Sequence, residues 1–265
     1  MVRNEAVLTE RREAVMLVTI NRPEARNAVN LAVSLGVGRA LDEADRDPDV
    51  RAVVITGQGD LSFCAGADLK AVARREIVVP VDGPEATWGF AGYVSHPISK
   101  PTIAAVKGFA MGGGTEIALA SDLVVAAKNA VFGLPEVKRG LFAGAGGAFR
   151  LVQQMPQKIA MELLLTGDSI TSERALELGL VNRVVDVEDV VATALDLADQ
   201  IASNAPLSVQ ATKRVALGIV GAVVRGEDPR WAQTEREART LMSSQDAQEG
   251  PRAFAEHRAP RWNGR

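Results

Sequence analysis

The chain of 265 residues has few of the side chains that most enzyme sites use. It contains one cysteine, Cys64, and two histidines, His96 and His257. One cysteine excludes a disulfide within the chain, and so few histidines leave no cluster with the spacing of zinc ligands. We therefore expect neither a metal site nor a bound cofactor.

Long apolar runs and a strong charge of one sign are also missing. No apolar stretch approaches the roughly 20 residues that span a bilayer, and residues 1–13 lack the apolar core of a signal peptide. The net charge of −3 gives no electrostatic footprint for nucleic acid or an anionic membrane. The basic cluster of Lys70, Arg74 and Arg75 is interpreted as a solvated helix face. We expect a cytoplasmic protein without nucleic-acid or membrane partners.

The rest of the composition is that of a globular protein. Hydrophobic residues make up 47% and charged residues 24% of the chain, and the length suits one large domain or a main domain with an appendage. Apolar runs without alternation, separated by helical patterns, indicate strands that are covered on both faces. The pattern predicts an α/β fold, with buried strands at residues 14–20, 51–57, 102–108 and 122–127 and helices at residues 31–44 and 113–120.

The pattern changes after about residue 185. From residue 188 onward the chain is almost wholly helical in pattern, with breaks at residues 204–206 and 226–229. We place a boundary between an α/β body, residues 1–195, and a helical region, residues 196–265. Such a region buries little by itself, so we expect it to pack on the body or on another subunit. Its predicted helices cover residues 188–203, 206–224, 230–243 and 246–258.

The sequence MGGGTE, residues 111–116, places three glycines at the start of a predicted helix and ends on Glu116. Amides at a helix N-terminus favour an oxyanion or a phosphate. A close-packed turn explains the glycines equally well, because glycine also lets a helix approach a strand. No Gly-Lys-Ser/Thr follows, and residues 144–147 lack the spacing of a dinucleotide-binding motif.

A second glycine motif, FCAGAD, occupies residues 63–68. Gly66 permits unusual backbone angles, so the amide of Ala67 could point into a cleft. Taken alone, the motif indicates a turn rather than a site. Asp68 is a candidate cap for a helix that begins at Leu69.

Glu136 follows Gly133-Leu134-Pro135 in FGLPEVKRG, twenty positions after Glu116. Proline restricts the residue before it to extended geometry, which fixes the approach of this segment. A lone glutamate in a loop is usually solvated. In combination, however, two carboxylates and several unhindered amides are the groups needed to hold a water and stabilise a developing enolate.

Six motifs occur along nearly the whole chain: NRPEARNAV (residues 21–29), FCAGADL (63–69), KPTIAAVKGFAMGGGTEIALASDL (100–123), FGLPEVKRGLFAGAGGAFRL (132–151), LTGDSITSERALELGLVNRVV (165–185) and EGPRAFAEHRAPRWNGR (249–265). Their order and spacing resemble the enoyl-CoA hydratase (crotonase) family. This resemblance implies a spiral of repeated ββα units, followed by a helical C-terminal region that builds homotrimers, often paired into hexamers.

The resemblance also implies the chemistry of the site. The family stabilises the enolate of an acyl-CoA thioester with two backbone amides, which by motif position belong to Ala67 and Gly113. Glu116 would position and activate water, and Glu136 would transfer the proton at the α-carbon. Coenzyme A enters as part of the substrate, not as a cofactor. Further candidates for contacts with CoA or substrate are Arg26, Ala65, Gly66, Asp68, Leu69, Gly112 and Phe142. Arg26 fits the CoA phosphates or a plain surface role equally well.

Both glutamates together are typical of the hydratases in this family, whereas isomerases usually keep only the one equivalent to Glu136. The expected activity is enoyl-CoA hydration in fatty acid metabolism, the reversible syn addition of water to a trans-2-enoyl-CoA. Carnitinyl-CoA dehydratases also resemble the chain and also use two glutamates, so they remain an alternative, with isomerases and non-catalytic acyl-CoA-binding relatives. His257 stands where a lysine is common in the family, which weakens the case for CoA phosphate contacts there.

Acyl specificity is expected to lie in the least patterned segment, residues 71–99. Trp88, Phe90 and Tyr93 supply most of its aromatic surface. Aromatic side chains at this spacing more often pack in a core than contact a ligand. The alternative is an apolar pocket for a medium, long or bulky acyl chain.

Overall fold

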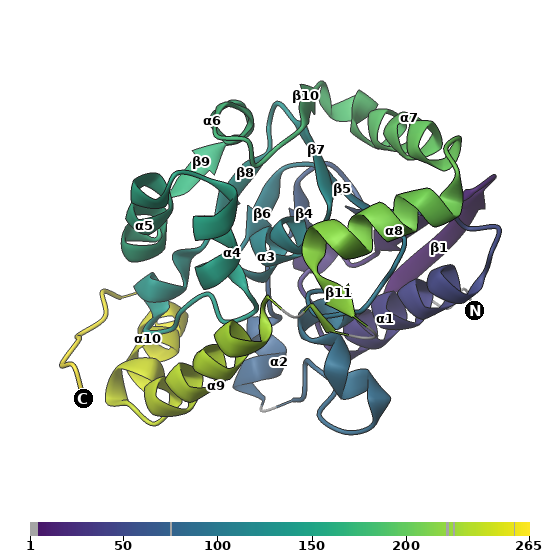
Figure 1. Cartoon of the computed structure of the whole chain (residues 1–265). Coiled ribbons are helices and arrows are strands. Elements are labelled where there is room, and N and C mark those ends of the chain that lie inside the picture. The colour runs from purple at the N-terminus through teal and green to yellow at the C-terminus, as the bar shows by residue number, and fades with distance from the viewer. Residues whose placement is uncertain (1–4, 75, 221–222, 225, 257) are drawn as a thin grey trace.

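The computed structural model describes residues 5–74, 76–220, 223–224, 226–256 and 258–265 (Figure 1). Arg75 and His257, which entered the sequence interpretation, lie outside these residues. Most strands belong to two sheets. The six-stranded sheet has the order β1 (Val7–Arg12), β2 (Val15–Ile20), β3 (Ala52–Gly57), β5 (Thr102–Val106), β7 (Leu123–Ala127) and β10 (Arg183–Val185). The four-stranded sheet has the order β4 (Ser62–Cys64), β6 (Phe109–Met111), β8 (Val131–Gly133) and β9 (Ser169–Thr171).

The four predicted strands are confirmed as β2, β3, β5 and β7, all parallel to one another. Their β-branched residues are buried except for Thr19, as expected for strands covered on both faces. The first strand, β1, pairs antiparallel with β2 and was not predicted, because its side chains are mostly exposed and polar. The strands of the four-stranded sheet were also missed, since three residues are too few to show a period.

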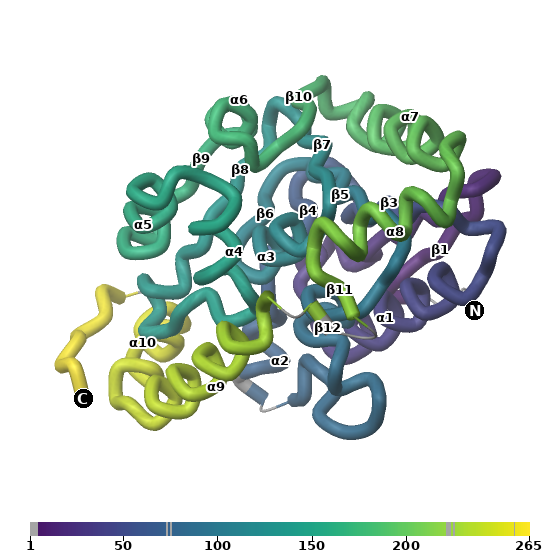
Figure 2. Tube along the Cα trace, in the orientation of Figure 1, coloured from purple at the N-terminus to yellow at the C-terminus, as the bar shows by residue number. Residues whose placement is uncertain are grey.

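The two sheets are built by one repeated unit. Each repeat sends one strand to the six-stranded sheet and the next strand to the four-stranded sheet: β3 then β4, β5 then β6, and β7 then β8. A helix follows each pair, namely α2 (Leu69–Ala73), α3 (Gly113–Ala120) and the short 3-10 helix η4 (Pro135–Arg139). This repetition confirms the predicted α/β spiral of ββα units, and Figure 2 shows the path of the chain through it.

Two helices cover the six-stranded sheet. The first, α1 (Leu31–Arg46), begins at the cap Asn30, whose side chain accepts a hydrogen bond from the Val33 amide, and it buries Val33, Val37 and Leu41. The second, α7 (Val190–Ala202), packs over β3, β5 and β7 through small residues that include Ala194 and Ala198. Residue 195 therefore lies inside a helix that packs on the sheet. The division of the chain at that residue stays a prediction.

The remaining helices lie around the second sheet and at the C-terminal end (Figure 1). They are α4 (Gly147–Gln154), α5 (Gln157–Thr166), α6 (Ser172–Glu177), α8 (Pro206–Leu217), α9 (Asp228–Met242) and α10 (Gln245–Ala255). The predicted helix over residues 206–224 is wrong beyond Leu217. Gly218 adopts the left-handed conformation with φ +65° and ends α8. The β-branched residues that follow form the hairpin strands β11 (Ile219–Val220) and β12 (Val223–Val224).

Among the helices of the described segments, none combines the length and the apolar character that a membrane span requires.

Candidate active site

The first of the two predicted amides begins α3. The chain leaves β6 at Met111 and turns through Gly112, which has φ +55° and whose amide donates to the Gly133 carbonyl at 2.8 Å. Below this turn, the hydroxyl of Thr115 donates to Ala110 and accepts from Gly133, which ties β6 to β8. The amide of Gly113 is the first of the helix and has no acceptor within it. No hydrogen bond joins it to another of the described residues.

The second predicted amide, that of Ala67, lies in an isolated parallel bridge with Val29. The Val29 amide donates to the Gly66 carbonyl and the Asp68 amide donates to the Val29 carbonyl, both at 2.8 Å. Because strand groups alternate in direction, the amide of Ala67 points away from Val29. Gly66, with φ +87°, brings this segment against α3, since a Cβ on Gly66 would stand 3.3 Å from the Gly113 nitrogen. The fold therefore places the two amides next to each other.

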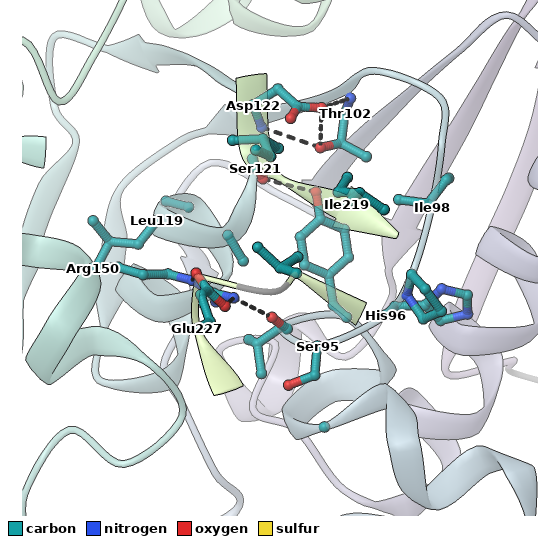
Figure 3. Close-up of a pocket in the computed structure, with 18 of the residues that line it drawn as sticks. Ser95, His96, Ile98, Thr102, Leu119, Ser121, Asp122, Arg150, Ile219 and Glu227 are labelled. Carbon is teal, nitrogen blue, oxygen red and sulfur yellow. Dashed lines mark hydrogen bonds and ion pairs between the residues drawn. The ribbon is translucent and has the colours of Figure 1, made fainter. Parts of the chain in front are cut away.

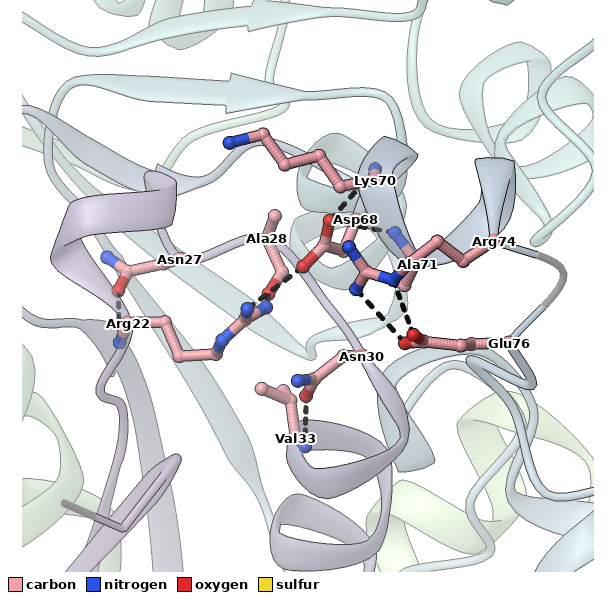
Figure 4. Close-up of polar contacts among 10 residues, drawn as sticks. All are labelled: Arg22, Asn27, Ala28, Asn30, Val33, Asp68, Lys70, Ala71, Arg74 and Glu76. Carbon is pink, nitrogen blue, oxygen red and sulfur yellow. Dashed lines mark hydrogen bonds and ion pairs between the residues drawn. The ribbon is translucent and has the colours of Figure 1, made fainter.

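Asp68 is confirmed as the cap of α2, because its Oδ1 accepts from the amides of Lys70 and Ala71. Its Oδ2 accepts from Arg22 at 2.9 Å, and the Arg22 guanidinium also donates to the Ala28 carbonyl (Figure 4). Burial opposes ionisation of Asp68, but the hydrogen bonds from Arg22 and the Ala71 amide outweigh it and lower the pKa of this carboxyl. Asp68 thus holds the Ala67 segment in place.

Glu116 lies on the first turn of α3 and is only 3% exposed. Its Oε1 accepts from the amides of Ala145 at 2.7 Å and Gly147 at 2.9 Å, at the N-terminus of α4. Burial raises the pKa of Glu116 to about 8, and the charge of Glu136 adds to the rise. The two amides and Arg150 act in the opposite direction. The carboxyl is therefore held rigidly and carries a proton more readily than an ordinary glutamate.

Glu136 reaches the same place from η4, where Pro135 occupies the first position of the turn. Its Oε1 lies beside Gly112, because a Cβ on Gly112 would stand 3.0 Å from that oxygen. Its Oε2 is buried and has no hydrogen-bond partner among the described residues. Burial raises the pKa of Glu136 to about 7. An unpaired buried carboxylate oxygen is costly, which makes it a natural acceptor for a ligand or a water.

The other predicted contact residues lie in different settings. Arg26 is exposed, with φ +53°, and its carbonyl accepts from the Ala65 amide at 3.1 Å, so its backbone supports the FCAGAD segment. Leu69 is 51% exposed at the start of α2. Phe142 is half-buried, with its ring beside Gly144. Contacts of these residues with CoA or with an acyl chain stay predictions.

The aromatic side chains of residues 71–99, where acyl specificity is expected, lie partly in the core and partly beside the candidate site. Trp88 is buried, contacts Gly38 and stacks on His96 at 5.3 Å. Tyr93 is also buried, and its hydroxyl hydrogen-bonds that of Ser121 at 2.7 Å. Both therefore pack in the core. Phe90 instead lies against Gly113, since a Cβ on this glycine would stand 2.2 Å from the ring, so Phe90 borders the candidate amide site.

The sequence interpretation missed the groups that hold Glu116. The amides of Ala145 and Gly147 were not predicted, although the small residues Gly144 to Gly147 before a helix are the signal for exposed amides. Nothing in the sequence indicated that Arg150, one turn later, would meet Glu227 from the C-terminal region.

A large cavity among the described residues is separate from the two glutamates. It has a volume of about 980 Å³ and lies between α3, β5 and the C-terminal elements α8, β11 and α9. Ser121, Asp122 and Arg150 line it, whereas neither Glu116 nor Glu136 does (Figure 3). Within the described segments, no three His, Cys, Asp or Glu side chains gather at a distance suited to a metal ion.

Comparison with known proteins agrees with this geometry. A family model described as enoyl-CoA hydratase/isomerase matches residues 10–265. A carnitinyl-CoA dehydratase of Salmonella typhi is 40% identical over 265 residues, which cover 99% of this chain and all of the relative.

Two crystal structures extend the comparison. Carnitinyl-CoA hydratase from Mycobacterium avium is 60% identical, with a TM-score of 0.96, over 98% of this chain and 99% of that one. Enoyl-CoA hydratase from Mycobacterium tuberculosis H37Rv is 46% identical, with a TM-score of 0.76, over 98% of this chain and all of that one. With these matches along almost its whole length, the chain belongs to the enoyl-CoA hydratase/isomerase family.

Proposed function

We propose that this protein adds water to, or removes it from, the 2,3-bond of an acyl-CoA thioester. The observation that carries the proposal is the meeting of two buried carboxyls, from Glu116 and Glu136, beside the amides of Ala67 and Gly113, which have no hydrogen-bond partner among the described residues. A thioester oxygen between these amides would be stabilised as it gains negative charge. Removing one such donor typically costs roughly 10²–10³ in rate.

The two carboxyls can divide the proton transfers. In dehydration, Glu136 removes the proton from the α-carbon and Glu116 donates a proton to the departing hydroxyl; hydration reverses both steps. Each positioned acid or base contributes roughly 10²–10⁴ in rate. Interacting carboxyls titrate as a pair. Because burial raises the pKa of both carboxyls, to about 7 for Glu136 and about 8 for Glu116, the pair can share one proton near neutral pH. With one proton shared, one carboxyl can act as the base and the other as the acid in dehydration.

Enoyl-CoA hydration and carnitinyl-CoA dehydration are the same chemistry on different acyl groups. The enoyl-CoA reading rests on the paired glutamates. The carnitinyl reading is favoured by the relatives, because the Mycobacterium avium structure matches more closely than the Mycobacterium tuberculosis structure in both identity and TM-score. A double-bond isomerase adds no water, so it would not use the carboxyl that positions and activates water. Assembly into trimers or hexamers and the CoA contacts remain expectations from the family.

The test follows the conjugated-thioester absorbance of a panel of 2-enoyl-CoA substrates, and the reverse reaction on 3-hydroxyacyl-CoA substrates. The panel includes short, long, branched and steroid-like chains, and the trimethylammonium-bearing compound formed when carnitinyl-CoA loses water. A preference of more than about tenfold in kcat/KM for the trimethylammonium substrate, equal to about 1.4 kcal/mol, would identify a carnitinyl-CoA dehydratase. The opposite order would identify an enoyl-CoA hydratase.

The controls are Glu116→Gln and Glu136→Gln, which keep the shape of each side chain and remove the proton transfer. The proposal is supported if the wild-type protein decreases the conjugated-thioester absorbance and neither variant does. Turnover that survives both substitutions, or a wild-type protein that binds acyl-CoA and converts none of the panel, would contradict it and leave an isomerase or a binding protein.

A further inference from the structure

A buried ion pair joins α4 to the start of α9. Arg150 donates to both carboxylate oxygens of Glu227, from Nε at 2.8 Å and from Nη2 at 2.6 Å, and Nη2 also donates to the Val94 carbonyl at 2.8 Å. The two side chains are 8% and 15% exposed. Figure 3 shows the pair at one edge of the large cavity. A bidentate pair of this kind fixes both distance and orientation.

Aromatic contacts reinforce the same junction. Phe149 packs edge-on against Trp231, with ring centroids 5.0 Å apart, and the Trp231 indole donates to Glu227 at 3.2 Å. The Arg150 guanidinium also lies 5.5 Å from the Trp231 ring. Two consecutive residues of α4 therefore meet one turn of α9, although nearly 80 positions separate Arg150 from Glu227 in the sequence. The junction is a specific contact rather than a loose approach of two helices.

The turn before α4 lies between this junction and Glu116. A Cβ on Gly146, which has φ +102°, would stand 3.0 Å from Arg150 Nη1 and 3.2 Å from Trp231. On the neighbouring residues, the amides of Ala145 and Gly147 hold Oε1 of Glu116. One small turn thus contacts the ion pair and also binds the carboxyl of Glu116.

We infer that the Arg150–Glu227 pair is a positioning device, through which the start of α9 fixes the turn that holds Glu116 in its reactive orientation. The inference rests on the proposed function for the role of Glu116. The pair does not touch the reacting atoms, so its effect is on placement. Misplacement of a reacting group by about 1 Å is enough to cost about 10²-fold in rate.

The charges around Glu116 agree with this role. The groups that face it are Glu136 from η4, Arg150 from α4 and the amides of Ala145 and Gly147. Among them, Arg150 is the cation that lowers the pKa of Glu116, against the rise due to burial and Glu136. Loss of Arg150 would therefore both loosen the turn and raise the pKa of Glu116 further.

The test compares Arg150→Met with Lys213→Met. Lys213 forms an equally buried ion pair between the C-terminal region and the body, with Asp122 at 2.7 Å and side-chain exposures of 10% and 20%, and it is not among the groups that act on Glu116. We expect Arg150→Met to lower kcat by about 10- to 100-fold with little change in KM, and Lys213→Met to leave kcat within about twofold. Arg150→Lys, which keeps the charge but not the bidentate geometry, should recover part of the loss.

Removal of one partner leaves a buried charge, so Arg150→Met alone can unfold the protein. The double variant Arg150→Met/Glu227→Met removes both charges and should keep its melting temperature, because apolar replacement of a buried pair is often neutral. Its kcat should still fall. A double variant that folds and retains full kcat would overturn the inference.

A double-mutant cycle separates positioning from general damage. In a Glu116→Gln background the carboxyl has already lost its function, so Arg150→Met should cost at most about twofold more. An equal loss in both backgrounds would contradict the inference.

The pH dependence of stability tests the inference without measuring turnover, so its outcome does not depend on the proposed function. The loss of stability with rising pH that depends on Glu116, measured as wild type against Glu116→Gln, should extend to higher pH when Arg150 is replaced. If it does not move, the inference fails even in an active enzyme. If it moves while no acyl-CoA is hydrated, the coupling stands and the proposed function fails.

Discussion

The two segments that carry the carboxyls differ in how they hold them. Glu116 stands on the regular helix α3, and the amides of Ala145 and Gly147, at the turn where α4 begins, bind one of its oxygens. Glu136 stands on a single 3-10 turn, and one of its oxygens is buried without a partner in the described part of the chain. Both have a raised pKa because both are buried.

This difference indicates different tasks. A carboxyl with one oxygen bound to the scaffold keeps a fixed direction, which suits a group that orients a water. A carboxyl whose free oxygen lies beside Gly112 can approach the substrate carbon directly. The same residue type, buried at Glu116 and partly buried at Glu136, therefore has different hydrogen bonds in the two segments, and these suit the two proposed roles.

The largest effect is expected for Glu136→Gln. This change leaves the fold nearly intact, since Oε2 has no partner among the described residues that it could lose. It removes the proton transfer at the α-carbon, so kcat should fall by roughly 10²–10⁴. The measurement is steady-state hydration on the preferred substrate of the panel. Full activity would show that the unpaired oxygen has no catalytic role.

Glu116→Gln should cause a similar loss of kcat, of roughly 10²–10⁴, while its carbonyl oxygen still accepts from Ala145 and Gly147. It should also change stability with pH. A folded pKa raised from 4.5 to about 8 makes the protein most stable when this carboxyl is protonated. That stability is present below pH 4.5 and is lost as the pH rises through 8.

Thermal melting of wild type and Glu116→Gln across this pH range measures the effect. The variant should lose less stability than wild type between pH 4.5 and 8. Parallel curves for the two proteins would mean that burial does not raise the pKa of Glu116.

Gly66→Ala tests whether the amide of Gly113 takes part in the reaction of the two carboxyls. The added methyl would stand 3.3 Å from the Gly113 nitrogen and 3.1 Å from the Met111 carbonyl, so it would cover the donor. We expect kcat to fall by roughly 10²–10³. The matched control is Gly179→Ala, at φ +82° with no atom within 4 Å. It shares the backbone strain of about 1–3 kcal/mol but should leave kcat unchanged.

The smallest effect is expected for Asp68→Asn, a third carboxyl at the site whose role is structural. Asn can still cap α2, but the substitution replaces the ion pair with Arg22 by a weaker neutral hydrogen bond, and it should cost about 1 kcal/mol in the free energy of unfolding. Because hydrogen bonds lower the pKa of Asp68 below 3.8, its contribution is present above that pH and is lost as the pH falls through the folded value. Urea unfolding at pH 7 and at pH 3 measures the difference. An unchanged midpoint at both values would contradict this role.

The sequence by itself determined the long buried strands, the helix α1 and the fold. Apolar runs such as that of β3 show their burial directly, since their residues are apolar at every position. The motifs also singled out both glutamates, and the resemblance to the family assigned the amides of Ala67 and Gly113, whose roles stay predictions. The cap Asp68 belongs to the same class of local information.

Only the tertiary structure decided how these parts act on one another. The bonds from Ala145 and Gly147 to Glu116 join residues about 30 positions apart, and no local pattern encodes such a meeting. Nor does any local pattern encode the raised pKa of each carboxyl, because that rise is due to burial by the whole fold. The hairpin after Leu217 was missed because an apolar run fits a helix and a strand equally well. The junction of Arg150 with Glu227 exists only because the spiral returns the C-terminal helices to the turn beside Glu116.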